Sequence, residues 1–232
     1  MSHPLTYFQI TPARALALGI AAVLGIAASC LAQDDFPKCT FNIGGGGAHA
    51  FGKDGASLDT GWNFHTGGGI ALPTNTDSHR NWRFYLTANF MLDELRINPE
   101  ALQHAKTYNP TDIGLLAASS GRAKFFAATL DPTIRVRAGD HATWYFFGGF
   151  GWFRRSLEFT GASIEGTLLQ PNNPVVFGTG GNSGAYELGG GINFKVSQRL
   201  GRMTPYAEAR YVHGLAINSA TSLVPFSLGV RW

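Results

Sequence analysis

Val224-Pro225-Phe226-Ser227-Leu228-Gly229-Val230-Arg231-Trp232 is the last stretch of the chain, and every second residue in it is apolar. Successive side chains of a β-strand point to opposite faces, so this stretch predicts a strand with one apolar and one polar face. Strands that face lipid on one side and a polar lumen on the other have this pattern. The apolar face would consist of Val224, Phe226, Leu228, Val230 and Trp232.

The same alternation recurs in three internal segments. Their apolar faces would consist of Trp82, Phe84, Leu86, Ala88, Phe90 and Leu92, of Phe126, Ala128, Leu130, Ile134 and Val136, and of Tyr186, Leu188, Ile192 and Phe194. The polar faces of the strands would direct a network of charged side chains into a lumen, namely Arg83, Asp93, Asp131, Arg135, Arg137, Glu187, Lys195, Glu208, Arg210 and Arg231. Because both signs are present, pairing would offset the cost of burying these charges.

Eight strands are expected along the chain, near residues 40–51, 61–72, 81–93, 123–138, 142–159, 184–196, 204–214 and 222–232. A bilayer core offers no water to backbone polar groups, so strands cross it only as a closed sheet. The predicted fold is therefore all-β, an eight-stranded antiparallel transmembrane up-and-down β-barrel. Eight strands enclose a lumen that side chains fill, which predicts no wide pore. The faces of 142–159 remain open, because aromatic residues occupy both parities in Trp144-Tyr145-Phe146-Phe147.

The connections differ in length in the way that such a barrel requires. The short ones are 73–80, 139–141 and 197–203, and the two longest, which fall at the opposite end, are 94–122 and 160–183. With both chain ends in the periplasm, the long loops would be extracellular. Within the first of them, Asn98-Pro99-Glu100 predicts a helix start with Asn as the cap, followed by a short surface helix over 99–106.

The composition favours an all-β protein. The 232 residues include 30 glycines, 12% aromatic and only 14% charged residues, whereas soluble proteins carry about 25% charged residues. Glycine clusters inside the expected strands would leave room for long lumen side chains, and a phosphate-binding loop is the alternative reading of them. No Lys/Arg-rich run stands beside interleaved aromatics, so the sequence gives no support for nucleic-acid binding.

The first 32 residues predict a cleaved signal peptide, because a basic start precedes a charge-free apolar run. Residues 33–39 would form a short periplasmic segment and 40–232 the barrel. Two alternatives stay open: the run could remain as an anchoring helix, or Cys30 could be lipidated. After cleavage only Cys39 would remain, and one cysteine cannot form an internal disulfide.

With this ending and these eight strands, the chain resembles the small OmpA-like outer-membrane β-barrel family over residues 40–232. A terminal Phe or Trp that closes an alternating strand resembles the signal recognised by the outer-membrane assembly machinery. The resemblance therefore implies insertion by that machinery into the bacterial outer membrane and contact with its lipids and lipopolysaccharide. It implies no substrate and no cofactor. Because the chain ends at its last expected strand, we expect no peptidoglycan-binding domain like that of the larger family members.

The expected function is a structural, envelope-integrity or surface-interaction role through the two long loops, whose ligand the sequence leaves unknown. The alternatives are a small ion-conducting pore, a soluble lipocalin-like carrier with its apolar faces inward, and a lipid A-modifying enzyme. The enzyme would need a serine activated by a histidine, for which His213, Ser219 and Ser222 are the candidates. No metal-binding, nucleotide-binding or hydrolase motif occurs, and His65 and His104 are expected to be structural or solvated.

Overall fold

The computed structural model describes residues 37–52, 55–73, 81–108, 118–139, 141–161, 176–195, 203–215 and 220–232. It contains eight strands: β1 (Cys39–Phe51), β2 (Gly61–Ala71), β3 (Trp82–Arg96), β4 (Ala118–Ala138), β5 (Ala142–Gly161), β6 (Val176–Phe194), β7 (Thr204–Gly214) and β8 (Thr221–Arg231). The predicted signal peptide, 1–32, lies outside the described residues.

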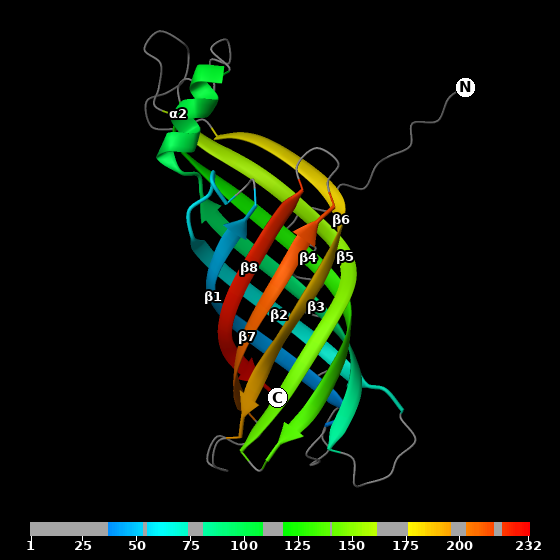
Figure 1. Ribbon diagram of the computed structural model, residues 1–232. Helices are drawn as coiled ribbons and strands as arrows, with labels where there is room; N and C mark the ends of the chain where they lie inside the picture. The colour runs from blue at the N-terminus through cyan, green and yellow to red at the C-terminus, as the bar shows by residue number, and fades with distance from the viewer. Residues whose placement is uncertain are drawn as a thin grey trace, which may run out of the picture.

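The eight strands form one closed antiparallel barrel, in which each strand pairs with its neighbour in sequence and β1 pairs with β8 (Figure 1). The closing seam runs from Asn42, opposite Arg231, to Phe51, opposite Ser222. Beyond the seam, the backbones of Phe41 and Trp232 exchange two hydrogen bonds of 2.7 and 2.9 Å. Closure satisfies the ladder of every strand, as a wall in hydrocarbon requires. The predicted fold class is confirmed.

Two strands, β4 and β6, begin well before the positions predicted from the sequence, and with β5 they are the longest strands of the barrel. β4, β5 and β6 have 21, 20 and 19 residues, whereas the other five have 11 to 15. The predicted loops were therefore too long, because Ala118–Arg122 belong to β4 and Val176–Ser183 belong to β6. These segments are rich in Ser and Gly, which disfavour strands, but backbone pairing with β5 overrides that tendency.

The connections fall at the two ends as predicted (Figure 1). The end with the connections β2–β3, β4–β5 and β6–β7 is called the short-turn end here, and the opposite one the loop end. Helix α2 (Pro99–Tyr108) stands at the loop end, where the Asn98 side chain accepts a hydrogen bond from the Glu100 N–H at 2.8 Å. The predicted helix and its cap are confirmed. Among the described residues, no helix has the length and hydropathy of a membrane span.

Glycines in β6 make room for aromatic side chains in the lumen. A Cβ atom on Gly191 would lie 2.4 Å from the Tyr145 hydroxyl, and one on Gly189 would lie 2.4 Å from the Phe147 ring. Such distances leave no space for a side chain, so the glycine cluster serves close approach, as expected.

Cys39 is the first residue of β1 and is disulfide-bonded in the full-length chain. The expectation of a single cysteine concerns the chain after cleavage of residues 1–32, and it stays a prediction.

Candidate functional site

The outer wall of the barrel is apolar. Large side chains that point outward are strongly exposed, and Phe150, Leu188 and Leu228 reach 74%, 58% and 59% of full exposure. Soluble monomers rarely present a continuous apolar surface of this kind. The faces of β5 are also clear: Trp144, Phe146, Phe150 and Trp152 point outward, whereas Tyr145, Phe147 and Phe153 point inward. A soluble carrier would have a polar exterior, so the lipocalin-like alternative does not fit.

The residues predicted as an assembly signal lie on this wall. Phe226, Leu228 and Trp232 are exposed, and Val224 and Val230 are partly exposed on the same face of β8. Trp232 also packs its ring 6.4 Å from that of Phe41 across the seam. The outward orientation is as predicted, and recognition by the assembly machinery stays a prediction.

Tryptophans mark two levels on the wall. Trp62 and Trp152 lie toward the loop end, and Trp82, Trp144 and Trp232 toward the short-turn end. Trp144 and Trp152 are on one strand, which at about 3.3 Å per residue separates them by roughly 26 Å. A strand tilt of about 40° reduces this separation to roughly 20 Å along the barrel axis. The apolar band between the two levels thus approaches the height of about 25 Å found in outer-membrane barrels.

The lumen is polar in its middle and toward the short-turn end, and Arg210 is at the centre of its charge network. The guanidinium of Arg210 is buried, lies 3.2 Å from a Glu187 carboxylate oxygen and forms a direct ion pair with Glu208. Glu208 also accepts a hydrogen bond of 2.9 Å from the Tyr145 hydroxyl and lies 3.7 Å from an Arg231 nitrogen. Two carboxylates therefore balance two guanidinium groups out of contact with water.

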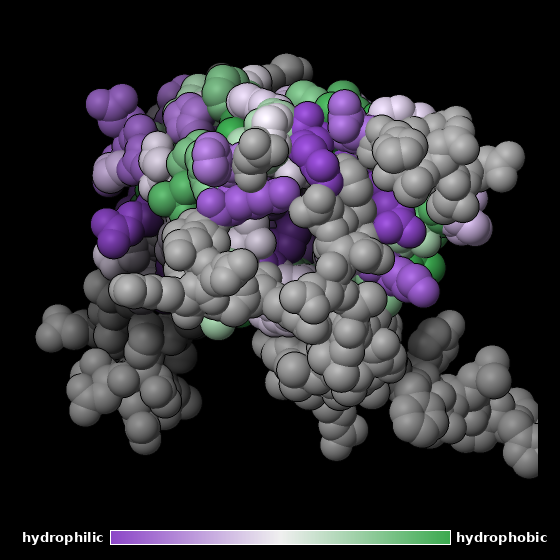
Figure 2. All heavy atoms as spheres, turned by 90° about the horizontal axis from the view of Figure 1, so that it is seen from below, coloured by the Kyte–Doolittle hydropathy of each residue, from purple (hydrophilic) through white to green (hydrophobic). Residues whose placement is uncertain are grey.

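Aromatic rings and hydroxyls complete this layer. The Arg231 guanidinium lies between the rings of Tyr145 and Tyr206, at 4.1 and 4.8 Å from their centroids. Arg135 stacks 4.2 Å from the Tyr85 ring and donates a hydrogen bond of 2.9 Å to Thr40. A cavity among these side chains has a volume of about 10 Å³, roughly what a single water molecule needs. Seen from the short-turn end, the coloured side chains are mostly hydrophilic (Figure 2).

The ten charged residues predicted for the lumen do not form one group. Four are joined by direct ion pairs, and Thr129 lies 2.9 Å from oxygens of both Asp131 and Glu187, which connects a fifth. Arg83 and Arg137 are half-buried, and Lys195 is exposed one residue past the end of β6. The four residues in direct ion pairs are Glu187, Glu208, Arg210 and Arg231.

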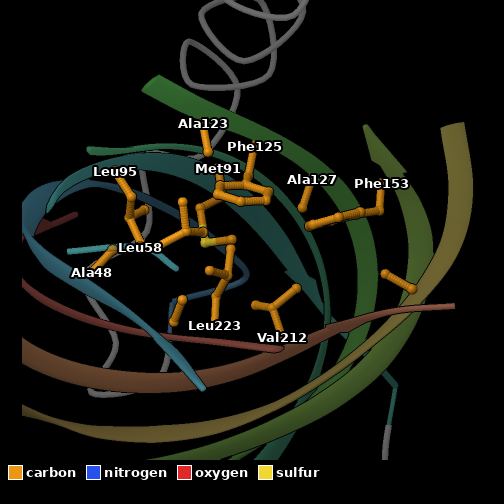
Figure 3. Packing of buried hydrophobic residues seen from close by; sticks show 12 residues of the cluster. Ala48, Leu58, Met91, Leu95, Ala123, Phe125, Ala127, Phe153, Val212 and Leu223 are labelled. Carbon is orange, nitrogen blue, oxygen red and sulfur yellow. The ribbon is translucent and has the colours of Figure 1, made fainter. Parts of the chain in front are cut away.

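Toward the loop end the lumen is filled by apolar side chains, which the sequence pattern did not predict. Figure 3 shows them pointing toward one another from strands all round the barrel. This apolar layer consists of Ala48, Ala50, Leu58, Met91, Leu95, Ala123, Phe125, Ala127, Phe153, Ala185, Val212 and Leu223. Packed hydrocarbon excludes water and ions, so the apolar layer closes the lumen independently of the charge network.

Asp93 lies at the level of the apolar layer. It is fully buried on β3 between Met91 and Leu95, pairs in register with Phe125, and neither of its carboxylate oxygens has a hydrogen-bond partner within the described part of the chain. An unpaired buried carboxylate is costly. Asp93→Asn should therefore raise the free energy of unfolding by about 1–3 kcal/mol, measured by urea unfolding in lipid vesicles. Exposed Asp59→Asn is the control, and a loss of stability in Asp93→Asn would contradict this expectation.

Two of the three residues considered for an enzyme meet on the outer wall near the loop end. His213 Nδ1 lies 2.8 Å from the Ser222 hydroxyl, and the Tyr211 hydroxyl lies 3.1 Å from the same oxygen. Ser219 lies outside the described residues. Within the described part of the chain, no hydrogen bond of His213 goes to a carboxylate that could act as a third, orienting acid.

The other two histidines considered from the sequence differ in their surroundings. His65 is buried in the lumen and lies 2.6 Å from the Tyr206 hydroxyl, and His104 is exposed on α2. No group of His, Cys, Asp and Glu that could hold a metal ion occurs within the described ranges.

No known sequence family and no curated protein matches this chain. Among solved structures, Neisserial surface protein A has a TM-score of 0.50 and 12% identity, covering 84% of this chain and 96% of that one. This chain has the fold of a small outer-membrane β-barrel. Ail of Yersinia pestis has a TM-score of 0.47 and 14% identity, covering 84% of this chain and 99% of its own. The closed eight-stranded barrel and its likeness to Neisserial surface protein A confirm, for the fold, the resemblance expected from the sequence.

Proposed function

We propose that this protein is an integral outer-membrane barrel that does not conduct and that presents its two long loops at the cell surface for an envelope-integrity or surface-interaction role. The observation that carries the proposal is the combination of an exposed apolar wall with a lumen filled by side chains. An apolar surface that runs around a closed barrel suits a bilayer. The filled lumen leaves the loop end as the part available to partners.

Fractionation tests the location. The protein should remain with outer membranes after a carbonate wash, and unboiled samples should migrate differently from boiled ones on gels, because a closed barrel resists detergent. Added protease should cleave the long loops in intact cells if these loops face outward. Recovery of the protein in the soluble periplasm would overturn the proposal, and protection of the loops would reverse the orientation.

The closed lumen makes a second measurable claim. Purified protein in planar bilayers should show no large, steady, ion-selective current, because the apolar layer and the charge network each close the lumen. Large steady currents that scale with the amount of inserted protein would support the pore alternative and contradict the filled interior.

A second candidate function is modification of lipid acyl esters, favoured by the 2.8 Å contact between His213 and Ser222. The Ser222 hydroxyl would attack an ester carbonyl while His213 takes its proton, the lipid alcohol would leave with that proton, and water would then release the fatty acid. Mass spectrometry of lipid A after expression tests this. A mass change that Ser222→Ala abolishes supports the enzyme, and an unchanged mass with the wild type rejects it.

A further inference from the structure

Six charged side chains occupy the outer face of β3, β4 and β5 near the loop end. Alternation along the strands places them outward, next to buried Leu95, Ala123 and Phe153 on the inner face. Strand pairing makes them neighbours, since Arg96 is opposite Arg122, Glu94 is opposite Lys124, and Arg122 is opposite Glu158. We call this set the basic patch: Glu94, Arg96, Arg122, Lys124, Arg154 and Glu158.

Ion pairs neutralise only part of the basic patch. Arg122 lies 3.2 Å from Glu94, and Lys124 lies 2.8 Å from Glu158. Arg96 and Arg154 are exposed, and neither guanidinium has an ion pair or a hydrogen bond within the described part of the chain. Four basic and two acidic groups therefore leave an excess of two positive charges on this face.

The basic patch begins where the apolar wall ends. Arg154 follows outward-pointing Trp152 by two residues on β5, and Glu94 is opposite Trp62 across the β2–β3 pair. Tryptophans of barrel proteins lie at the membrane interface, so the basic patch stands at the height of lipid headgroups. Positive charge at this height attracts anionic headgroups, with about 1 kcal/mol for each Lys or Arg.

We infer that the basic patch is a binding site for the phosphate groups of a glycolipid in the outer leaflet. Arg96 and Arg154 supply the guanidinium groups that donate to phosphate oxygens, and Arg122 and Lys124 extend the positive surface between them. Planar guanidinium groups bind phosphate in a bidentate manner. The inference rests on the proposed outer-membrane location with the loop end outward, and it names the lipid contact of that wall.

The experiment compares two full-length variants that lose the same charge. Arg96→Gln/Arg154→Gln removes the unpaired guanidinium groups, and Lys38→Gln/Lys195→Gln removes two exposed positive charges at the short-turn end, away from the basic patch. Binding of detergent-solubilised, folded protein to lipopolysaccharide is measured at low salt. The first variant should bind about 30-fold more weakly than the wild type, whereas the control should bind as the wild type does. Moderate salt should reduce this difference.

Two further arms identify the ligand. Lipopolysaccharide from which the phosphates have been removed should bind equally weakly to the wild type and to Arg96→Gln/Arg154→Gln. Competition by inorganic phosphate at millimolar concentration, with no preference for the lipid, would show that free phosphate and not a headgroup is the ligand, and would overturn the inference. Equal binding by both variants would also overturn it. The gel shift on boiling reports the barrel itself, so a folded barrel without lipid binding refutes the inference and leaves the proposed function intact.

Discussion

Leu188→Arg is expected to lower the free energy of unfolding by about 2–4 kcal/mol in lipid vesicles, the cost of a basic residue at the middle of a barrel wall. Leu188 is strongly exposed and pairs in register with Gly148 of β5, midway between the tryptophans at 144 and 152. A charge at this level has hydrocarbon on every side except that of the barrel. Urea unfolding followed by tryptophan fluorescence measures the effect.

The control for this variant is Gln103→Arg on the exposed surface of α2. The same side chain is introduced there outside the apolar wall, so the stability should change by no more than about 0.5 kcal/mol. If Leu188→Arg were as stable as the wild type, the outer wall would not face hydrocarbon and the membrane location would be refuted.

Arg210→Met is expected to cost about 3–5 kcal/mol, because removing one partner of a buried ion pair leaves the others uncompensated. Two carboxylates, those of Glu187 and Glu208, depend on this guanidinium. Methionine keeps much of the volume beside the Phe147 ring, over which Arg210 lies at 4.8 Å, so the loss is mainly electrostatic. The same unfolding experiment in vesicles measures it.

The double variant Arg210→Met/Glu208→Gln separates charge from packing. It removes one of the stranded charges, so it should regain part of the stability that Arg210→Met loses. Lys38→Met, an exposed change at the short-turn end, should stay close to the wild type. A small loss in Arg210→Met would mean that the charge network contributes little to barrel stability.

The alternation of apolar and polar residues predicted most of the fold. The period of two places Phe226, Leu228 and Trp232 on one face whatever the tertiary structure, and the structure has all three exposed. The number of strands and the end at which the long loops lie followed from the same period and from connection lengths. Strand ends did not, because pairing across β4, β5 and β6 extends them through Ser- and Gly-rich sequence.

The packing of side chains inside the barrel could be predicted less well from the sequence. Met91 and Leu95 occupy the inward parity of β3 between polar residues, where apolar side chains look like exceptions to the pattern. Their apolar character is explained by the closed barrel, in which Val212 and Leu223 of distant strands pack against them. Partner choice in the charge network depends in the same way on register between strands, which no single strand reveals. The parity of apolar residues on the supposedly polar face is the signal that could have found the apolar layer.

The lumen is filled by apolar side chains toward the loop end and by charged ones below them, and this difference determines what would block the passage of solutes. Water or ions that entered the lumen from the short-turn end would reach packed apolar side chains before the loops, at the level of Met91 and Val212. The lumen is thus closed at two levels, by the buried charge network and, nearer the loops, by the apolar layer. A variant that conducts ions would therefore need smaller side chains in the apolar layer, because removing charges alone would leave that layer closed.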